Sequence, residues 1–109
     1  MDVNRQWRVA RLVEPGELLG PGHFAWQEAP PPVPADGEVL MRTLCLSTSP
    51  AQRGYISINR SRQLLPDLAV GEVMRGRGIG VVVESRHPDF RPGELYDASL
   101  GWQDYSIQR

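Results

Sequence analysis

The chain has 109 residues, of which 40% are hydrophobic, and a formal net charge of −1. This length makes a single domain, residues 1–109, with one modest core, and the apolar content is too high for a disordered polypeptide. Because the arginines are scattered among acids, no basic face for nucleic acid is expected. Eleven glycines and ten prolines favour turn-rich β structure over long helices.

Cysteine content and hydropathy exclude several further classes of protein. Cys45 is the only cysteine, so there is neither an internal disulfide framework nor an all-cysteine zinc cluster. The first twelve residues hold no apolar run of signal-peptide length, and no stretch is long and apolar enough to span a membrane. We therefore expect a cytoplasmic location and no membrane partner.

Two short strands are predicted in the first third of the chain. Residues Gln6–Val13 alternate in part between apolar and polar side chains, which predicts a half-buried strand. Residues 14–22 are interpreted as a loop, and a second strand is expected within residues 24–30. The proline run that follows is interpreted as a connector ending in an Asp-Gly turn at 36–37; an SH3-type ligand is the alternative.

The strongest predicted strand covers residues 38–47. It is nearly continuous in apolar residues except for Arg42, which predicts that both faces are covered. Residues 50–54 could form one helical turn, and residues 56–70 are left open as a surface loop. Three further strands are expected at Ile79–Ser85, Leu95–Ala98 and Trp102–Ile107. Together these elements predict a mainly β fold with little helix, either a small barrel or a sandwich.

The glycine-rich stretch at residues 71–85 resembles a phosphate-binding loop at first sight. A dinucleotide fingerprint needs its glycines between a strand and the start of a helix, but Gly76, Gly78 and Gly80 lead into a run of valines that predicts a strand. A P-loop fails as well, because Arg77 stands where lysine is required. The glycines are interpreted as allowing close backbone approach at a barrel corner.

No metal site and no catalytic residue are predicted from the residues themselves. Cys45 is interpreted as a small core residue, and His23 and His87 as exposed loop histidines, because none of them shows a paired ligand spacing. A serine nucleophile would need a G-x-S-x-G elbow. The hydroxyls that lack this elbow are those of Ser47, Ser49 and Ser57.

Four segments are more specific in combination than any single motif. In chain order they read NRQWRVAR, EVLMRTLCLSTSPAQRGYI, GEVMRGRGIGVVVESRHPDFRPGEL and LGWQDYSI. From Asn4 to about Ile107 the chain resembles the N-terminal part of the zinc-independent medium-chain dehydrogenases/reductases. The closest subgroup is the NADP-dependent alkenal double-bond reductases, which include the leukotriene B4 dehydrogenase, prostaglandin reductase and curcumin reductase types.

The resemblance implies a GroES-like, partly open β-barrel that forms the substrate-side domain of an oxidoreductase. In the family a Rossmann domain, absent from residues 1–109, carries NADP(H), so this chain alone is expected to bind no cofactor and to be inactive. The implied substrate is an α,β-unsaturated aldehyde or ketone, which receives hydride at its β-carbon and is then protonated at its α-carbon. Leu46 stands where zinc-dependent relatives have a cysteine ligand, so the resemblance also implies no zinc.

The resemblance also implies the site residues. The family reads Asp-Pro-Tyr-Met-Arg-Gly beside the nicotinamide, and this chain departs from it in three of the six positions. The resemblance also implies a set of substrate residues. The implied cofactor-side residues are Pro50, Ala51, Gln52, Arg53 and Gly54. The implied substrate residues are Tyr55, Met74, Arg75, Gly76 and Trp102, although core packing is the favoured role of Trp102.

A second hypothesis keeps the fold and changes the function. A stand-alone GroES-like module could act as a binding or interaction protein without catalytic activity. Apolar surface that a cofactor domain covers in the family would then be exposed and could support a homodimer or another partner.

Overall fold

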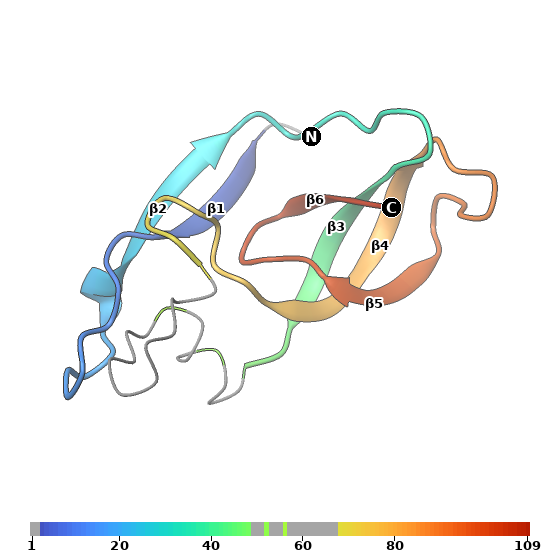
Figure 1. Ribbon diagram of the computed structural model, residues 1–109. Coiled ribbons are helices and arrows are strands. Elements are labelled where there is room, and N and C mark those ends of the chain that lie inside the picture. Colours follow the sequence, from blue (N-terminus) through green and yellow to red (C-terminus); the bar gives the residue numbers. More distant parts are fainter. Residues whose placement is uncertain (1–2, 49–51, 53–55, 57–67) are drawn as a thin grey trace.

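The computed structural model describes residues 3–48, 52, 56 and 68–109. In that part of the chain the strands are antiparallel and form two sheets (Figure 1). The elements are β1 (Asn4–Val9), the 3-10 helix η1 (Pro21–His23), β2 (Phe24–Ala29), β3 (Val39–Leu46), β4 (Arg77–Ser85), β5 (Leu95–Ser99) and β6 (Tyr105–Gln108). The mainly β fold predicted from the sequence is confirmed, as two sheets that do not close into a full barrel.

The smaller sheet pairs β1 with β2 in a regular antiparallel register. The other edge of β1 bonds to loops, because the Trp7 amide donates to the carbonyl of Trp102 (2.9 Å) and the Trp7 carbonyl accepts from the amide of Met74 (2.9 Å). The strand was expected to reach Val13 but ends at Val9. Beyond that point the backbone bonds elsewhere, and the Val13 amide donates to the carbonyl of Ile56 (2.8 Å).

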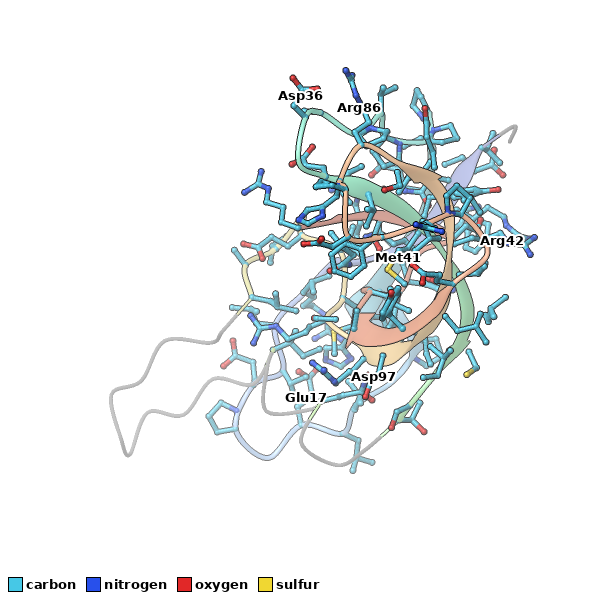
Figure 2. All side chains as sticks on the ribbon, turned by 90° about the vertical axis from the view of Figure 1, so that its right-hand side faces the viewer. Glu17, Asp36, Met41, Arg42, Arg86 and Asp97 are labelled. Atoms are coloured by element: carbon cyan, nitrogen blue, oxygen red, sulfur yellow. The ribbon has the colours of Figure 1, made fainter. Side chains whose placement is uncertain are left out.

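The larger sheet has the strand order β5-β4-β3-β6. The pairing of β3 with β4 shifts register twice, and the second shift leaves Leu44 as a bulge. The prediction that both faces of β3 are covered is wrong in its second half: Met41 is buried, whereas Arg42, Leu44 and Cys45 are exposed. Figure 2 shows Met41 inside the molecule and Arg42 extending away from it.

The exposure of Cys45 also overturns its interpretation as a core residue. The bulge at Leu44 changes the alternation of the strand, so that Cys45 pairs with Ile79 on the outer side of the sheet. An apolar run alone could not reveal this change of face.

The last three strands lie close to their expected positions, with one clear difference. β6 begins at Tyr105 rather than at Trp102, because Gly101 adopts a positive φ of 77° and turns the backbone toward another partner. The amide of Trp102 then donates to the carbonyl of Met74 (2.8 Å). Trp102 thus leaves the sheet and faces the smaller sheet instead.

Among the described residues the buried apolar side chains form two clusters, one for each part of the fold. The first holds Val9, Val13, Ile56, Leu68 and Met74, with Leu12, Phe24 and Trp102 packed against it. The second holds Val39, Met41, Val82 and Leu100, with Leu46, Phe90, Tyr96 and Ala98 packed against it. The packing of Trp102 on the first cluster agrees with its favoured structural role.

The connector between the sheets has no strand, as expected. Its Asp-Gly turn is present, since Gly37 has a φ of 82° and the amide of Glu38 donates to the carbonyl of Ala35 (3.0 Å). Within the described ranges no helix is long and apolar enough to cross a membrane.

Candidate functional site

The glycine-rich stretch enters a strand and not a helix. Gly78 and Gly80 lie inside β4, and a Cβ on Gly78 would stand 2.0 Å from the carbonyl oxygen of Cys45. A Cβ on Gly80 would stand 3.0 Å from the carbonyl oxygen of Arg42. The glycines therefore allow close packing of two backbones, as predicted, and the space in front of Gly78 is already filled by protein.

Gly76 lies just before β4 and brings three of the implied site residues together. A Cβ on Gly76 would stand 2.7 Å from Cδ1 and 2.8 Å from Nε1 of Trp102, and 3.6 Å from Nε2 of Gln52. Only glycine allows the indole to lie so close to this backbone. Gly76, Trp102 and Gln52 thus form one cluster, which is the candidate functional site.

Gln52 holds this cluster to the end of β3. Its Nε2 donates to the carbonyl oxygens of Ser47 (3.2 Å) and Arg75 (3.4 Å). The other members of the implied cofactor-side set, and one of the implied substrate set, lie outside the described residues. These are Pro50, Ala51, Arg53, Gly54 and Tyr55.

Trp102 combines a packing role with an unused donor. Its ring packs against Phe24 with centroids 5.1 Å apart at 31°, while Nε1 is buried and has no hydrogen-bond partner among the described residues. A buried N–H without an acceptor costs about 1–3 kcal/mol, and native folds keep few of them. This donor lies against Gly76, at the edge of the candidate site.

Met74 and Arg75 complete the implied substrate set. The Met74 side chain is 1% exposed and belongs to the first core cluster, and its backbone amide and carbonyl are both hydrogen-bonded. Arg75 is half-buried and its carbonyl accepts from Gln52. Substrate contact by either residue stays a prediction.

His23 was predicted to be an exposed loop histidine, and this is wrong. Its side chain is buried in η1, where Nδ1 accepts from the amide of Gly20 (3.1 Å) and Nε2 lies 3.1 Å from Oε1 of Glu17. The backbone amide of Glu14, followed by Arg11 and His23, lowers the pKa of Glu17 to about 2. The short 3-10 turn folds the ring inward, which the loop-like composition of residues 14–22 concealed.

No group of three or more His, Cys, Asp or Glu side chains in the described part of the chain could hold a metal ion. His87 is partly exposed, and its Nδ1 accepts from the amide of Asp89 (3.0 Å). Leu46, the residue in the position of a zinc ligand, packs against the second core cluster.

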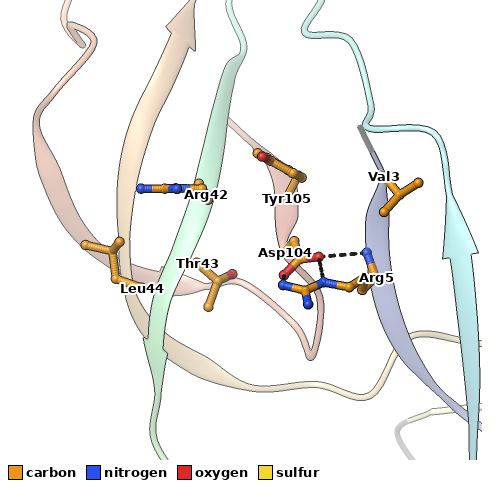
Figure 3. A pocket seen from close by; sticks show the side chains of 7 residues that line it. All are labelled: Val3, Arg5, Arg42, Thr43, Leu44, Asp104 and Tyr105. Carbon is orange, nitrogen blue, oxygen red and sulfur yellow. Dashed lines mark hydrogen bonds and ion pairs between the residues drawn. The ribbon is translucent and has the colours of Figure 1, made fainter. Parts of the chain in front are cut away.

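A polar hollow of about 460 Å³ lies between β1 and the β3–β6 pair (Figure 3). Arg5 and Asp104 form a bidentate ion pair across it, with Nε–Oδ2 at 2.7 Å and Nη2–Oδ1 at 3.1 Å. The same carboxylate accepts from the Arg5 amide (2.9 Å). The hydrogen bond to the Arg5 side chain is the main cause that lowers the pKa of Asp104. This contact fixes β1 to the loop before β6.

A second hollow of about 460 Å³ opens beside it and is lined mainly by apolar side chains, among them Trp7, Trp26 and Trp102. No role was predicted from the sequence for Trp7 and Trp26. The alternation of Gln6, Trp7 and Arg8 placed Trp7 with Val9 on the apolar face of the strand, and this is wrong, because Gln6 is buried and Trp7 is 42% exposed.

Residues 5–109 match the family described as the N-terminal domain of oxidoreductase. The chain belongs to this family. It is 38% identical over 104 residues to the NADPH-dependent curcumin reductase of Escherichia coli, covering 95% of this chain and 29% of that protein. It is also 36% identical over 72 residues to prostaglandin reductase 1 of Oryctolagus cuniculus, covering 66% of this chain and 18% of that protein.

Solved structures agree with this oxidoreductase family. The crystal structure of CurA from Vibrio vulnificus superposes with a TM-score of 0.83 at 36% identity, covering 96% of this chain and 30% of that one. CurA in complex with NADPH gives the same TM-score at 33% identity, covering 95% of this chain and 30% of that one. The predicted resemblance to medium-chain dehydrogenases/reductases is confirmed, and the chain spans less than a third of the length of these relatives.

Proposed function

We propose that this chain is the substrate-side domain of an NADPH-dependent oxidoreductase that reduces the C=C bond of α,β-unsaturated aldehydes or ketones. The supporting observation is the match of 95% of the chain to an NADPH-dependent curcumin reductase of which it covers 29%. A relative from Nicotiana tabacum, 32% identical over 74 residues, is a 2-alkenal reductase that depends on NADP(+). Substrate binding would use this domain, and the remaining length of such an enzyme would carry the cofactor.

The described residues do not fit the phosphates of a dinucleotide. Gly78 lies in a strand whose backbone meets β3, which leaves no cradle of amides in front of it. Gln52, beside Gly76, is the described residue that could face the nicotinamide. NADPH, when bound, supplies the hydride, and the chain alone is proposed to bind none and to be inactive.

The proposed contribution of this chain is placement of the enone and stabilisation of charge. The Trp102 N–H, which has no acceptor among the described residues, would donate to the carbonyl oxygen as negative charge develops there. The indole and Phe24 would keep water from the reacting atoms. Gly76 permits this arrangement because a side chain there would displace the ring.

The test is the activity of this chain joined to the cofactor domain proposed above. A 2-alkenal should oxidise NADPH and give the saturated aldehyde, whereas the matching alkanal should not react. Trp102→Phe keeps a ring and removes the donor, and should lower kcat about 10²–10³-fold. Leu18→Ala, at an exposed loop position, is the control. An unchanged kcat in Trp102→Phe would contradict the proposed role of the Trp102 N–H as a hydrogen-bond donor to the substrate.

Cofactor binding by the chain alone is a separate measurement. Titration calorimetry with NADPH should give no binding heat, because the cradle for the phosphates is proposed to lie outside residues 1–109. Micromolar affinity would contradict this division of roles.

A stand-alone interaction module is the second candidate function. The observation that favours it is exposed apolar surface on the larger sheet, where Ile79 is 36% and Leu95 is 59% exposed on neighbouring strands. If this surface pairs two copies, light scattering should find a dimer, and Leu95→Asp should convert it to a monomer.

A further inference from the structure

All three tryptophans of the chain line one hollow, although they are far apart in the sequence. Trp7 comes from β1, Trp26 from β2, and Trp102 from the loop before β6. The hollow measures about 460 Å³, a size common for small-ligand pockets. The residues that line it are Arg5, Trp7, Trp26, Thr43, Leu46, Trp102, Gln103 and Asp104.

The indole rings are held in place and remain partly uncovered. Trp7 and Trp26 are partners across the β1–β2 ladder, with ring centroids 5.1 Å apart and planes at 72°. This edge-to-face contact fixes both rings, yet they stay 42% and 50% exposed. Trp102 is supported from the core side by Phe24. The rings therefore offer preorganised aromatic surface to a ligand.

The polar side chains of Thr43, Gln103 and Asp104 are engaged with other residues, whereas the buried Trp102 N–H has no partner among the described residues. The Thr43 hydroxyl donates to the carbonyl of Gln103 (2.7 Å). The side-chain Nε2 of Gln103 donates to the carbonyl of Leu100 (3.0 Å). Its Oε1 accepts from the side chains of Asn4 and Gln6 on β1. Asp104 is paired with Arg5. Recognition in this hollow would therefore rest on ring contacts and apolar burial more than on new hydrogen bonds.

We propose that the tryptophan-lined hollow is a binding site for an uncharged planar aromatic ring. An indole face attracts the edge or the offset face of another ring, which a saturated ring of similar size cannot reproduce. The site goes beyond the proposed reduction, because Trp102 is its only member among the implied substrate and cofactor residues. Trp102 is the shared wall between this hollow and the Gly76–Gln52 cluster.

The test is an NMR titration of the 109-residue chain with 2-naphthol. Three tryptophans give three indole N–H signals, and all three should shift along one saturable curve with a single Kd. Decahydro-2-naphthol, which has the same carbon skeleton but is saturated and not planar, should bind at least about tenfold more weakly. Non-saturating shifts, or equal affinity for the two compounds, would overturn the proposal. No cofactor is present, so the outcome is independent of whether the reductase function holds.

Variants distinguish binding in the hollow from nonspecific binding to other apolar surface of the chain. Trp26→Ala should weaken 2-naphthol binding about tenfold or more, and Trp26→Phe should fall between it and the unmodified chain. Leu18→Ala is the control, because Leu18 is an exposed apolar residue that lies outside the hollow. Retained affinity in a folded Trp26→Ala or Trp26→Phe variant would overturn the proposal. Indole signals that shift with protein concentration alone would instead identify the hollow as an interface between copies.

Discussion

The smaller sheet and the larger sheet are fixed by different kinds of contact. In the smaller sheet β1 buries Asn4 and Gln6, which bond to Gln103 almost a hundred positions away in the sequence. In the larger sheet β3 and β4 approach so closely that only glycine fits at Gly78. The first arrangement depends on complete satisfaction of polar groups, and the second depends on steric fit.

The largest loss of stability is expected for Gly78→Ala, because the close approach of β3 and β4 leaves no room for a side chain. The new Cβ would stand 2.0 Å from the Cys45 carbonyl oxygen, which is backbone and cannot rotate away. We expect a loss of about 3 kcal/mol or more in the free energy of unfolding, measured by urea denaturation. Gly80→Ala, at 3.0 Å from backbone, should cost less, and Gly20→Ala, with open space around it, should change little. Equal losses at all three positions would contradict the role of close approach.

The next largest loss of stability is expected for Asn4→Ala, which removes a side chain from the buried hydrogen bonds of the smaller sheet. The Asn4 side chain donates to the carbonyl of Tyr105 (3.1 Å) and accepts from its amide (2.9 Å). Its removal leaves these groups buried and unpaired, which should cost about 2–4 kcal/mol in unfolding free energy. Gln108→Ala, which loses contacts to the Ser99 carbonyl and to the Ser106 hydroxyl, should cost less than about 1 kcal/mol. An unchanged unfolding free energy in Asn4→Ala would show that water replaces the hydrogen bonds of the Asn4 side chain.

The stability of the fold is expected to depend on pH through Glu17, in the loop before β2. Because folding lowers the pKa of Glu17 from 4.5 to about 2, the folded state favours its ionised form. The stabilisation is complete above pH 4.5 and is lost as the pH falls toward 2. Urea midpoints of the unmodified chain should therefore fall more steeply across this window than those of Glu17→Gln. Parallel curves for the two proteins would rule out Glu17 as the source.

The smallest effect is expected at the turn before β3. Arg86 Nη2 lies 2.8 Å from Oδ1 of Asp36, and Figure 2 shows both side chains at the surface. Exposed ion pairs add little because water and salt screen them. Asp36→Ala should change the unfolding free energy by no more than about 0.5 kcal/mol, and a larger loss would show that the turn itself was disturbed.

The sequence predicted the strands well because apolar alternation and turn residues are local properties. The close approach at Gly78 followed from glycines inside a valine-rich stretch, and this stretch forms β4 as expected. The outward position of Cys45 could not be predicted, because the bulge depends on how two strands align. The burial of His23 was missed for a similar reason, since a single turn with its own hydrogen bonds decides it.

The candidate site was predictable only in part. Gly76 and Trp102 were named from the family resemblance, and the structure brings them into contact. Trp7 and Trp26 were not named, because nothing in a linear sequence shows that positions 7, 26 and 102 meet. Their meeting depends on the hydrogen bonds that seat β1 against residues 102–104.

The bonds of Asn4 also bear on the order in which this domain can fold. Asn4 donates to the side chain of Gln103 and to the carbonyl of Tyr105, and it accepts from the Tyr105 amide. These partners lie about a hundred positions away in the sequence, so the contacts carry the loop-closure cost of non-local pairing. Until that loop closes, the Asn4 side chain has none of these partners, and β1 is therefore expected to reach its final position late in folding.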